Sequence, residues 1–179
     1  MSHPSEPDPA RSGMQKPVAL ADLVDALDVQ TETSHAYLDR VTGEVHRLTN
    51  DELSAADRTE DDLTDLEREV IELARTIRDD EAGRYLALPD KQEIHEYRFL
   101  EDFAYAYPDE EISEDLAEAI RGRGAFRRFK DAVQRLGIAE EWYEYRYQRL
   151  REVAKEWCEA EGVPYLETRE TVPVEEPPG

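Results

Sequence analysis

Cysteine is almost absent from this 179-residue chain, which contains only Cys158. A single cysteine cannot form an internal disulfide, and it excludes a metal site built from several thiolates. Long apolar runs are also missing: no stretch approaches the ~20 residues needed to span a bilayer, and residues 1–17 lack the apolar core of a secretory signal. We therefore expect a cytoplasmic protein that has no membrane partner.

Positive charge is scarce as well. The chain has 22 Lys and Arg against 44 Asp and Glu, a formal net charge of −22. Such a molecule repels phosphate backbones and anionic membranes at long range, so nonspecific binding of nucleic acid by the whole protein is unfavourable. In so acidic a chain, neighbours such as Glu110 and Glu111 indicate nothing specific about acid/base catalysis.

The remaining residues that could carry catalysis do not form a familiar pattern. Cys158 lies beside Glu159, whose charge disfavours a thiolate, so we interpret it as a packing residue. A hairpin could bring two histidines together, but two alone make a weak metal site. We expect no metal, no cofactor and no catalytic residue, and hence a protein that is not an enzyme. The histidines, which lack zinc-site spacing, are His3, His35, His46 and His95.

The composition divides the chain into one domain and two ends. Residues 1–17 and 164–179 are rich in Pro, Ser and Glu, which bury too little apolar surface to offset the entropy of ordering, so we expect disordered tails. Between them, residues 18–163 hold most of the apolar and aromatic side chains and form a single domain of ordinary size.

Hydrophobic patterns within the domain predict an α+β fold that is mostly helical. Two runs rich in β-branched and aromatic residues flank Thr42–Gly43 and predict an antiparallel hairpin, to which residues 85–88 can add a third strand. Thr64 and Glu67 have the spacing of a capping box at the start of a helix. We expect the hairpin, residues 34–39 and 44–49, to pack on five or six helices, which include 18–27, 64–80, 90–106, 112–121, 124–136 and 139–161.

Several of these stretches occur in the order found in a known family. The chain resembles the UPF0158 family of uncharacterised bacterial proteins over residues 18–163. The resemblance supports the limits of the domain and implies no activity. It is carried by LADLVDALD, AYLDRVTGEV, YLALPDKQEIHEYRFLEDF, RGRGAFRRFKDAVQRLGI and EWYEYRYQRLREVAKEWCEAEGV.

A basic cluster interrupts the acidic sequence at RGRGAFRRFKD, residues 121–131. It could be the solvated face of a helix that buries Phe126 and Phe129, a site for phosphate or carboxylate, or a contact for an acidic helix of a partner. Glycines allow close backbone approach, but the pattern matches neither a Walker loop nor a dinucleotide fingerprint. The candidate residues for an anion or a partner are Arg121, Gly122, Arg123, Gly124, Arg127, Arg128 and Lys130.

A second unusual cation lies within the apolar stripe of the last helix. Arg146 is spaced between Trp142 and Leu150, so the pattern predicts partial burial and a carboxylate partner. Glu96 and Glu93 are the candidates. Arg146 could instead extend to the surface or bind an anion.

Two functions remain open at this point. The first is a non-enzymatic interaction protein that binds another protein or a small anionic ligand. The second is a nucleic-acid-associated factor that uses residues 121–130 locally, or whose acidic surface mimics a phosphate backbone.

Overall fold

A three-stranded antiparallel sheet organises the first half of the chain, with β2 as its middle strand. The structure is a computed structural model that describes residues 15–57, 59, 61 and 63–167. Tyr37 of β2 lies opposite His46 of β3 on one side and Ala87 of β4 on the other. The predicted hairpin and its third strand are therefore confirmed. The strands are β1 (Val18–Ala19), β2 (Ser34–Asp39), β3 (Val45–Thr49), β4 (Tyr85–Ala87) and β5 (Tyr165–Leu166).

Most of the described chain is helical, as predicted. The capping box of α3 is present: Thr64 Oγ1 accepts from the Glu67 amide, and the Glu67 carboxylate accepts from the Thr64 amide at 2.8 Å. The helix expected over 90–106 is instead two helices, because His95 takes a left-handed backbone conformation. The helices are α1 (Leu20–Asp28), α2 (Asn50–Ser54), the 3-10 turn η2 (Ala55–Asp57), α3 (Asp65–Arg78), α4 (Lys91–Ile94), α5 (Glu96–Ala106), α6 (Glu110–Ala119), α7 (Ala125–Arg135) and α8 (Ala139–Glu161).

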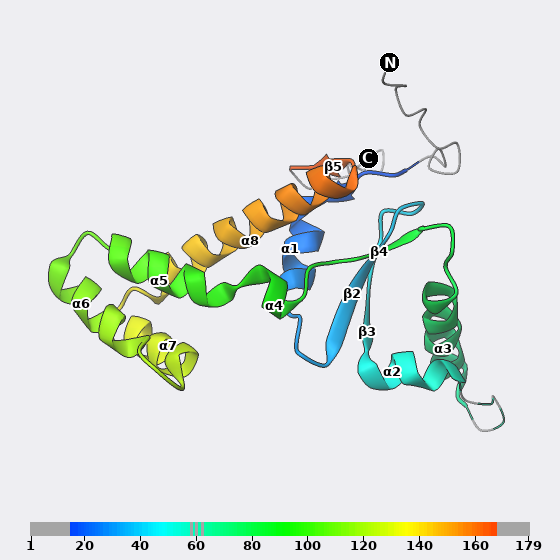
Figure 1. The fold of residues 1–179 in the computed structure, drawn as a ribbon, viewed down its shortest axis with the longest axis horizontal. Helices are drawn as coiled ribbons and strands as arrows, with labels where there is room; N and C mark the ends of the chain where they lie inside the picture. Colours follow the sequence, from blue (N-terminus) through cyan, green and yellow to red (C-terminus); the bar gives the residue numbers. More distant parts are fainter. Residues whose placement is uncertain (1–14, 58, 60, 62, 168–179) are drawn as a thin grey trace, which may run out of the picture.

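The two faces of the sheet pack against different helices, because successive side chains of a strand point in opposite directions. Ala36 and Leu38 of β2 are buried in the main core, which α1 and the helices from α4 onward also build. Tyr37 packs instead on a smaller cluster formed around Leu48 and Ala74. The sheet therefore lies between α2 and α3 on one side and α1 with the helices from α4 onward on the other (Figure 1).

An aromatic cluster joins α5, α7 and α8 at the end of the molecule opposite α3 (Figure 1). The Phe129 ring lies 4.7 Å from the Trp142 ring and 6.1 Å from the Phe103 ring, both in edge-to-face geometry. The prediction that Phe126 is also buried is wrong, because its side chain is 51% exposed. The buried stripe of α7 consists of Ala125, Phe129, Ala132 and Val133.

The two ends of the described chain meet in a short parallel pair. Val18 of β1 lies opposite Tyr165 of β5, and the Val18 amide donates to the Pro164 carbonyl at 3.1 Å. β5 belongs to the segment that we predicted as a C-terminal tail, so residues 165–166 are part of the fold. The remainder of the predicted tails, residues 1–14 and 168–179, lies outside the described residues.

Candidate functional site

The loop between α6 and α7 carries the basic cluster and is held in place by one of its own arginines. Gly122 and Gly124 have φ values of 72° and 76°, a left-handed conformation that other residues adopt at a cost. The Arg128 guanidinium donates to the carbonyls of Ala119, Arg121 and Arg123. Arg128 therefore closes the end of α6 and fixes the loop, so it has little capacity left for an external ligand.

Four other cations of the cluster point outward. Arg121, Arg123, Arg127 and Lys130 are exposed, and none of them forms an ion pair with another residue in the described part of the chain. Arg127 and Lys130 are three residues apart on one face of α7, and Arg121 and Arg123 lie in the loop that precedes the helix. We refer to these four side chains as the basic edge.

An exposed aromatic pair lies beside the basic edge. The Phe126 ring contacts the Tyr97 ring in edge-to-face geometry, with centroids 6.4 Å apart. Tyr97 is held in turn, because its hydroxyl donates to the Ile120 carbonyl at 2.9 Å. The basic edge thus adjoins a fixed apolar surface that is large enough to contact a partner side chain.

The basic edge lies outside the groove nearest to it. The nearby groove between α6 and α7 has a volume of about 480 Å³, and it is lined by Arg128 and Arg135 together with Asp115, Glu118 and Asp131. Arg121, Arg123 and Arg127 do not line that groove. The candidate residues therefore have two roles. Arg128 and the two glycines hold the loop in place, and the side chains of the basic edge are exposed to an extended ligand.

Arg146 lies where its spacing predicted, in contact with two carboxylates. Its side chain is 21% exposed, and it donates to Glu96 at 2.8 Å and to Asp28. Burial on its own lowers the pKa of Arg146, but the hydrogen bond to Asp28 and the charge of Glu96 outweigh it and raise the pKa. The carboxylates of Asp28 and Glu96 thus occupy the positions that a bound anion would take at Arg146. The arrangement is a structural ion pair.

Glu93, the other candidate partner of Arg146, makes a different contact. Its carboxylate accepts from the Asp90 amide at 2.8 Å and completes a capping box at the start of α4. Asp28 was not among the predicted partners. It ends α1, and α1 packs along α8, a contact that no local pattern indicates.

Sequence reasoning also missed an ion pair whose carboxylate is almost fully buried. The Asp39 side chain is 3% exposed, and Arg84 binds it in bidentate fashion, Nε to Oδ1 at 2.9 Å and Nη2 to Oδ2 at 2.7 Å. Burial by itself raises the pKa of Asp39, but the bonds from Arg84 and from the Val41 amide lower it to about 2. The pair joins the hairpin to the segment that enters β4.

Comparison with known proteins places the chain in a family. The sequence model of an uncharacterised protein family (UPF0158) matches residues 15–176, which is most of the chain. The chain belongs to the UPF0158 family. No curated protein and no solved structure matches it significantly. Family membership therefore supports the resemblance found in the sequence and assigns no activity to the basic edge.

The remaining candidates in this UPF0158 chain do not assemble into a reactive centre. His35 Nε2 lies 2.8 Å from Asn50 Oδ1, whereas His46 packs near the Tyr85 ring. Within the described residues, no group of three or more side chains of His, Cys, Asp or Glu could hold a metal ion. Cys158 is fully buried, and burial raises its pKa to about 11, so its thiol is a packing group.

None of the described helices is both long enough and apolar enough to cross a membrane.

Proposed function

We propose that this protein is a non-enzymatic, cytoplasmic interaction protein, and that its basic edge binds an acidic segment of a protein partner. One observation carries the proposal: four exposed cations on one edge lack a carboxylate within the described chain, although acidic residues outnumber basic ones two to one. Arginine binds carboxylates in a planar, bidentate geometry, which suits such a partner. The single cysteine accords with a reducing compartment.

The shape of the surface favours a protein segment over a small anion. The cations lie along a loop and a helix face and do not line the nearby groove between α6 and α7, so an extended ligand can contact several of them. Phe126 adds an exposed apolar contact beside Arg123 and Arg127. Aromatic and arginine side chains together are the residues that most often dominate the free energy of protein–protein binding.

Single-stranded nucleic acid is the second candidate, because an exposed ring among cations can stack on a base. The observation in its favour is the position of Phe126 next to Arg127. The formal net charge of −22 opposes it, since the field of the whole molecule repels a polyanion more strongly than a short acidic peptide.

The test compares two double variants of equal charge. Arg123→Ala with Arg127→Ala removes the centre of the basic edge, whereas Arg47→Ala with Arg68→Ala removes two exposed arginines from β3 and α3, near the other end of the molecule (Figure 1). Melting temperatures should stay close to that of the parent in both, because exposed side chains contribute little to stability.

Binding is then measured with defined probes. We titrate a labelled peptide of glutamates with one central leucine, and labelled single-stranded RNA and DNA, at low and moderate salt. We expect the peptide to bind the parent and the control variant equally, and to bind the Arg123/Arg127 variant at least about tenfold more weakly. Tighter binding of RNA or DNA, with a steep salt dependence that the same variant removes, would favour the second candidate. Equal binding of the peptide by all three proteins would refute the first role of the basic edge, and equal binding of RNA and DNA by all three would refute the second.

A further inference from the structure

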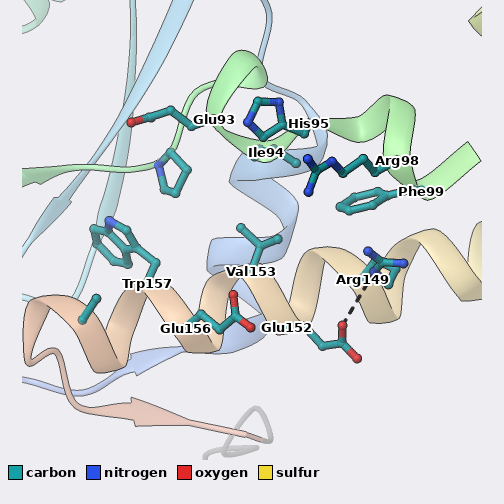
Figure 2. A pocket seen from close by; sticks show the side chains of 12 residues that line it. Glu93, Ile94, His95, Arg98, Phe99, Arg149, Glu152, Val153, Glu156 and Trp157 are labelled. Atoms are coloured by element: carbon teal, nitrogen blue, oxygen red, sulfur yellow. Dashed lines mark ion pairs between the residues drawn. The ribbon is translucent and has the colours of Figure 1, made fainter. Parts of the chain in front are cut away.

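A groove separates the junction of α4 and α5 from the second half of α8 (Figure 2). Its volume of about 460 Å³ falls within the range of about 300 to 1,000 Å³ that is common for small-molecule sites. It lies apart from the basic edge, and neither the sequence analysis nor the family assigns it a role. Its contacts and charges show what kind of ligand it suits.

The floor of the groove is apolar. Ile94 and Phe99 are buried and come from α4 and α5, and Val153 and Trp157 of α8 are half-buried against the main core. Figure 2 shows the Trp157 ring at one end and the Phe99 ring toward the other. A ligand that covers this floor removes apolar surface from water, so its body should be apolar.

Both walls carry charged residues: Glu93 and Arg98 come from the α4–α5 wall, and Arg149, Glu152 and Glu156 come from α8. Arg98 of α5 lies on one side, and Glu152 and Glu156 of α8 lie on the other (Figure 2). Neither Arg98 nor Glu156 forms an ion pair with a residue in the described ranges. Each therefore offers a full charge to a molecule that lies between the walls.

The neighbouring cation Arg149 is already occupied. It donates to Asp102 at 2.8 Å and to the Tyr145 hydroxyl at 2.6 Å, and its guanidinium stacks 4.7 Å above the Phe99 ring. Glu152 lies 3.7 Å from its Nε. Arg149 and Glu152 thus neutralise each other at one end, and the Glu93 carboxylate accepts from the Asp90 amide. Arg98 and Glu156 are the lining charges that have no such contact in the described residues.

The backbone of the α4–α5 wall is also suited to an anion. His95 has φ 54° and ψ 51°, a strained conformation for a residue with a side chain, and residues held in this way often occur at ligand sites. The break at His95 places the N-terminal end of α5 at the groove. The helix dipole disfavours a cation in the first turn of a helix, where Arg98 lies. An anion bound here would interact favourably both with the Arg98 guanidinium and with the N-terminal end of α5.

We propose that this groove binds a small zwitterion with an apolar body, the chemistry of a free hydrophobic amino acid or of a short hydrophobic peptide. The carboxylate lies at Arg98 beside the start of α5, the ammonium group lies at Glu156, and the apolar side chain covers Val153 and Trp157. Each group of the ligand then meets a residue of the matching kind.

The experiment follows the fluorescence of Trp157 in the full-length protein. L-leucine, L-phenylalanine and the dipeptide leucyl-leucine are titrated in parallel, and they distinguish a free amino acid from a short peptide. Two analogues each lack one charge: L-leucinamide has no carboxylate and N-acetyl-L-leucine has no ammonium group. We expect a saturable change for the zwitterions that Trp157→Phe abolishes, because Trp142 is buried away from the groove.

Two charge-neutralising variants then test the assigned contacts. Arg98→Gln should weaken leucine binding by about tenfold or more and leave leucinamide binding unchanged, and Glu156→Gln should weaken leucine in the same way and leave N-acetyl-leucine unchanged. Lys91→Gln and Glu140→Gln remove exposed charges outside the groove and should leave the binding of leucine and of both analogues unchanged.

The proposal is overturned if no zwitterion gives a saturable signal at millimolar concentration, or if the Arg98 and Glu156 variants bind leucine as tightly as the controls do. An Arg127→Gln variant should bind leucine normally, so the outcome is independent of the basic edge. Calorimetry on the parent and these five charge variants gives a second readout that does not depend on the fluorescence of tryptophan.

Discussion

Removing the charge of Arg84 should destabilise the protein more than removing the charge of Asp39, although the two residues form one pair. Asp39 is 3% exposed and Arg84 is 43% exposed. Arg84→Met leaves a buried carboxylate without its partner, which typically costs about 3 to 5 kcal/mol. Asp39→Asn leaves an arginine that water can solvate and keeps an oxygen for the Val41 amide.

The cost of Asp39→Asn follows from the pKa of Asp39. Lowering this pKa from 3.8 to about 2 corresponds to roughly 2 kcal/mol, at about 1.4 kcal/mol per pKa unit. Because the folded pKa is depressed, the contribution is fully present above the unfolded pKa, and it is lost as the pH falls through the folded value. The parent should therefore exceed the Asn variant by about 2 kcal/mol at neutral pH and converge with it near pH 2.

In the Arg84→Met variant, ionisation of Asp39 should destabilise the fold, whereas in the parent it stabilises the fold. Without its arginine, the buried Asp39 has a pKa above that of the unfolded chain, since burial disfavours the charged form. Its deficit relative to the parent is then largest at neutral pH and shrinks in acid. The assay is urea unfolding of the parent and both variants from neutral pH to about pH 2, with the exposed Asp65→Asn as a control for the many other carboxylates.

Two results would refute this reasoning. One is an Asn variant that is as stable as the parent at neutral pH, which would show that the pair contributes nothing net. The other is an Arg84→Met variant whose stability changes with pH as that of the parent does, which would show that Asp39 is solvated.

Four further changes have expected outcomes, each measured by urea or thermal unfolding. Arg146→Ala should destabilise by about 3 kcal/mol, because it leaves Glu96 half-buried without its cation, and an unchanged melting temperature would show that the pair is fully solvated. Phe129→Ala should cost about 3 to 5 kcal/mol, whereas Phe126→Ala should cost about 1 kcal/mol or less, because that ring is half exposed; equal costs would contradict the packing of α7. Gln30→Met should stabilise by about 1 kcal/mol, since the buried Gln30 amide makes no hydrogen bond to a described residue, and a loss of stability would show that the amide is satisfied. His95→Gly should stabilise by about 1 kcal/mol through relief of the left-handed backbone, and a destabilised variant would mean that the imidazole makes a stronger contact.

Patterns that depend on near neighbours were sufficient to predict much of the fold. The hairpin needs a turn glycine between two β-rich runs, and Gly43 has φ 75°. The Thr64 capping box acts over three residues, and α8 covers 139–161 as its periodicity indicates. These features can be predicted from the sequence because the contacts that produce them join residues close together in the chain.

The break at His95 shows where periodicity fails. Residues 90–106 have continuous helical spacing, which would place Glu93 and Glu96 on one face and make both available to Arg146. The left-handed His95 interrupts that spacing, so Glu96 meets Arg146 while Glu93 caps α4 and lines the groove. Nothing in the sequence indicates that a histidine will adopt this conformation, because tertiary packing imposes it.

Ion pairing is the property that sequence reasoning could least predict, and both proposed sites depend on it. Asp39 and Arg84 are 45 residues apart, and Arg146 and Asp28 are 118 apart, so only the folded chain brings them together. The folded chain also gives different roles to two adjacent arginines of the basic cluster. Arg128 donates to three backbone carbonyls, while Arg127 is exposed and forms no ion pair with a described residue. Even in a chain with twice as many acids as bases, some described cations form no ion pair, among them Arg127 on the surface and Arg98 in a groove that Glu156 also lines. The direction of each cation, and not the number of cations in a segment, therefore determines which of them are available to a ligand.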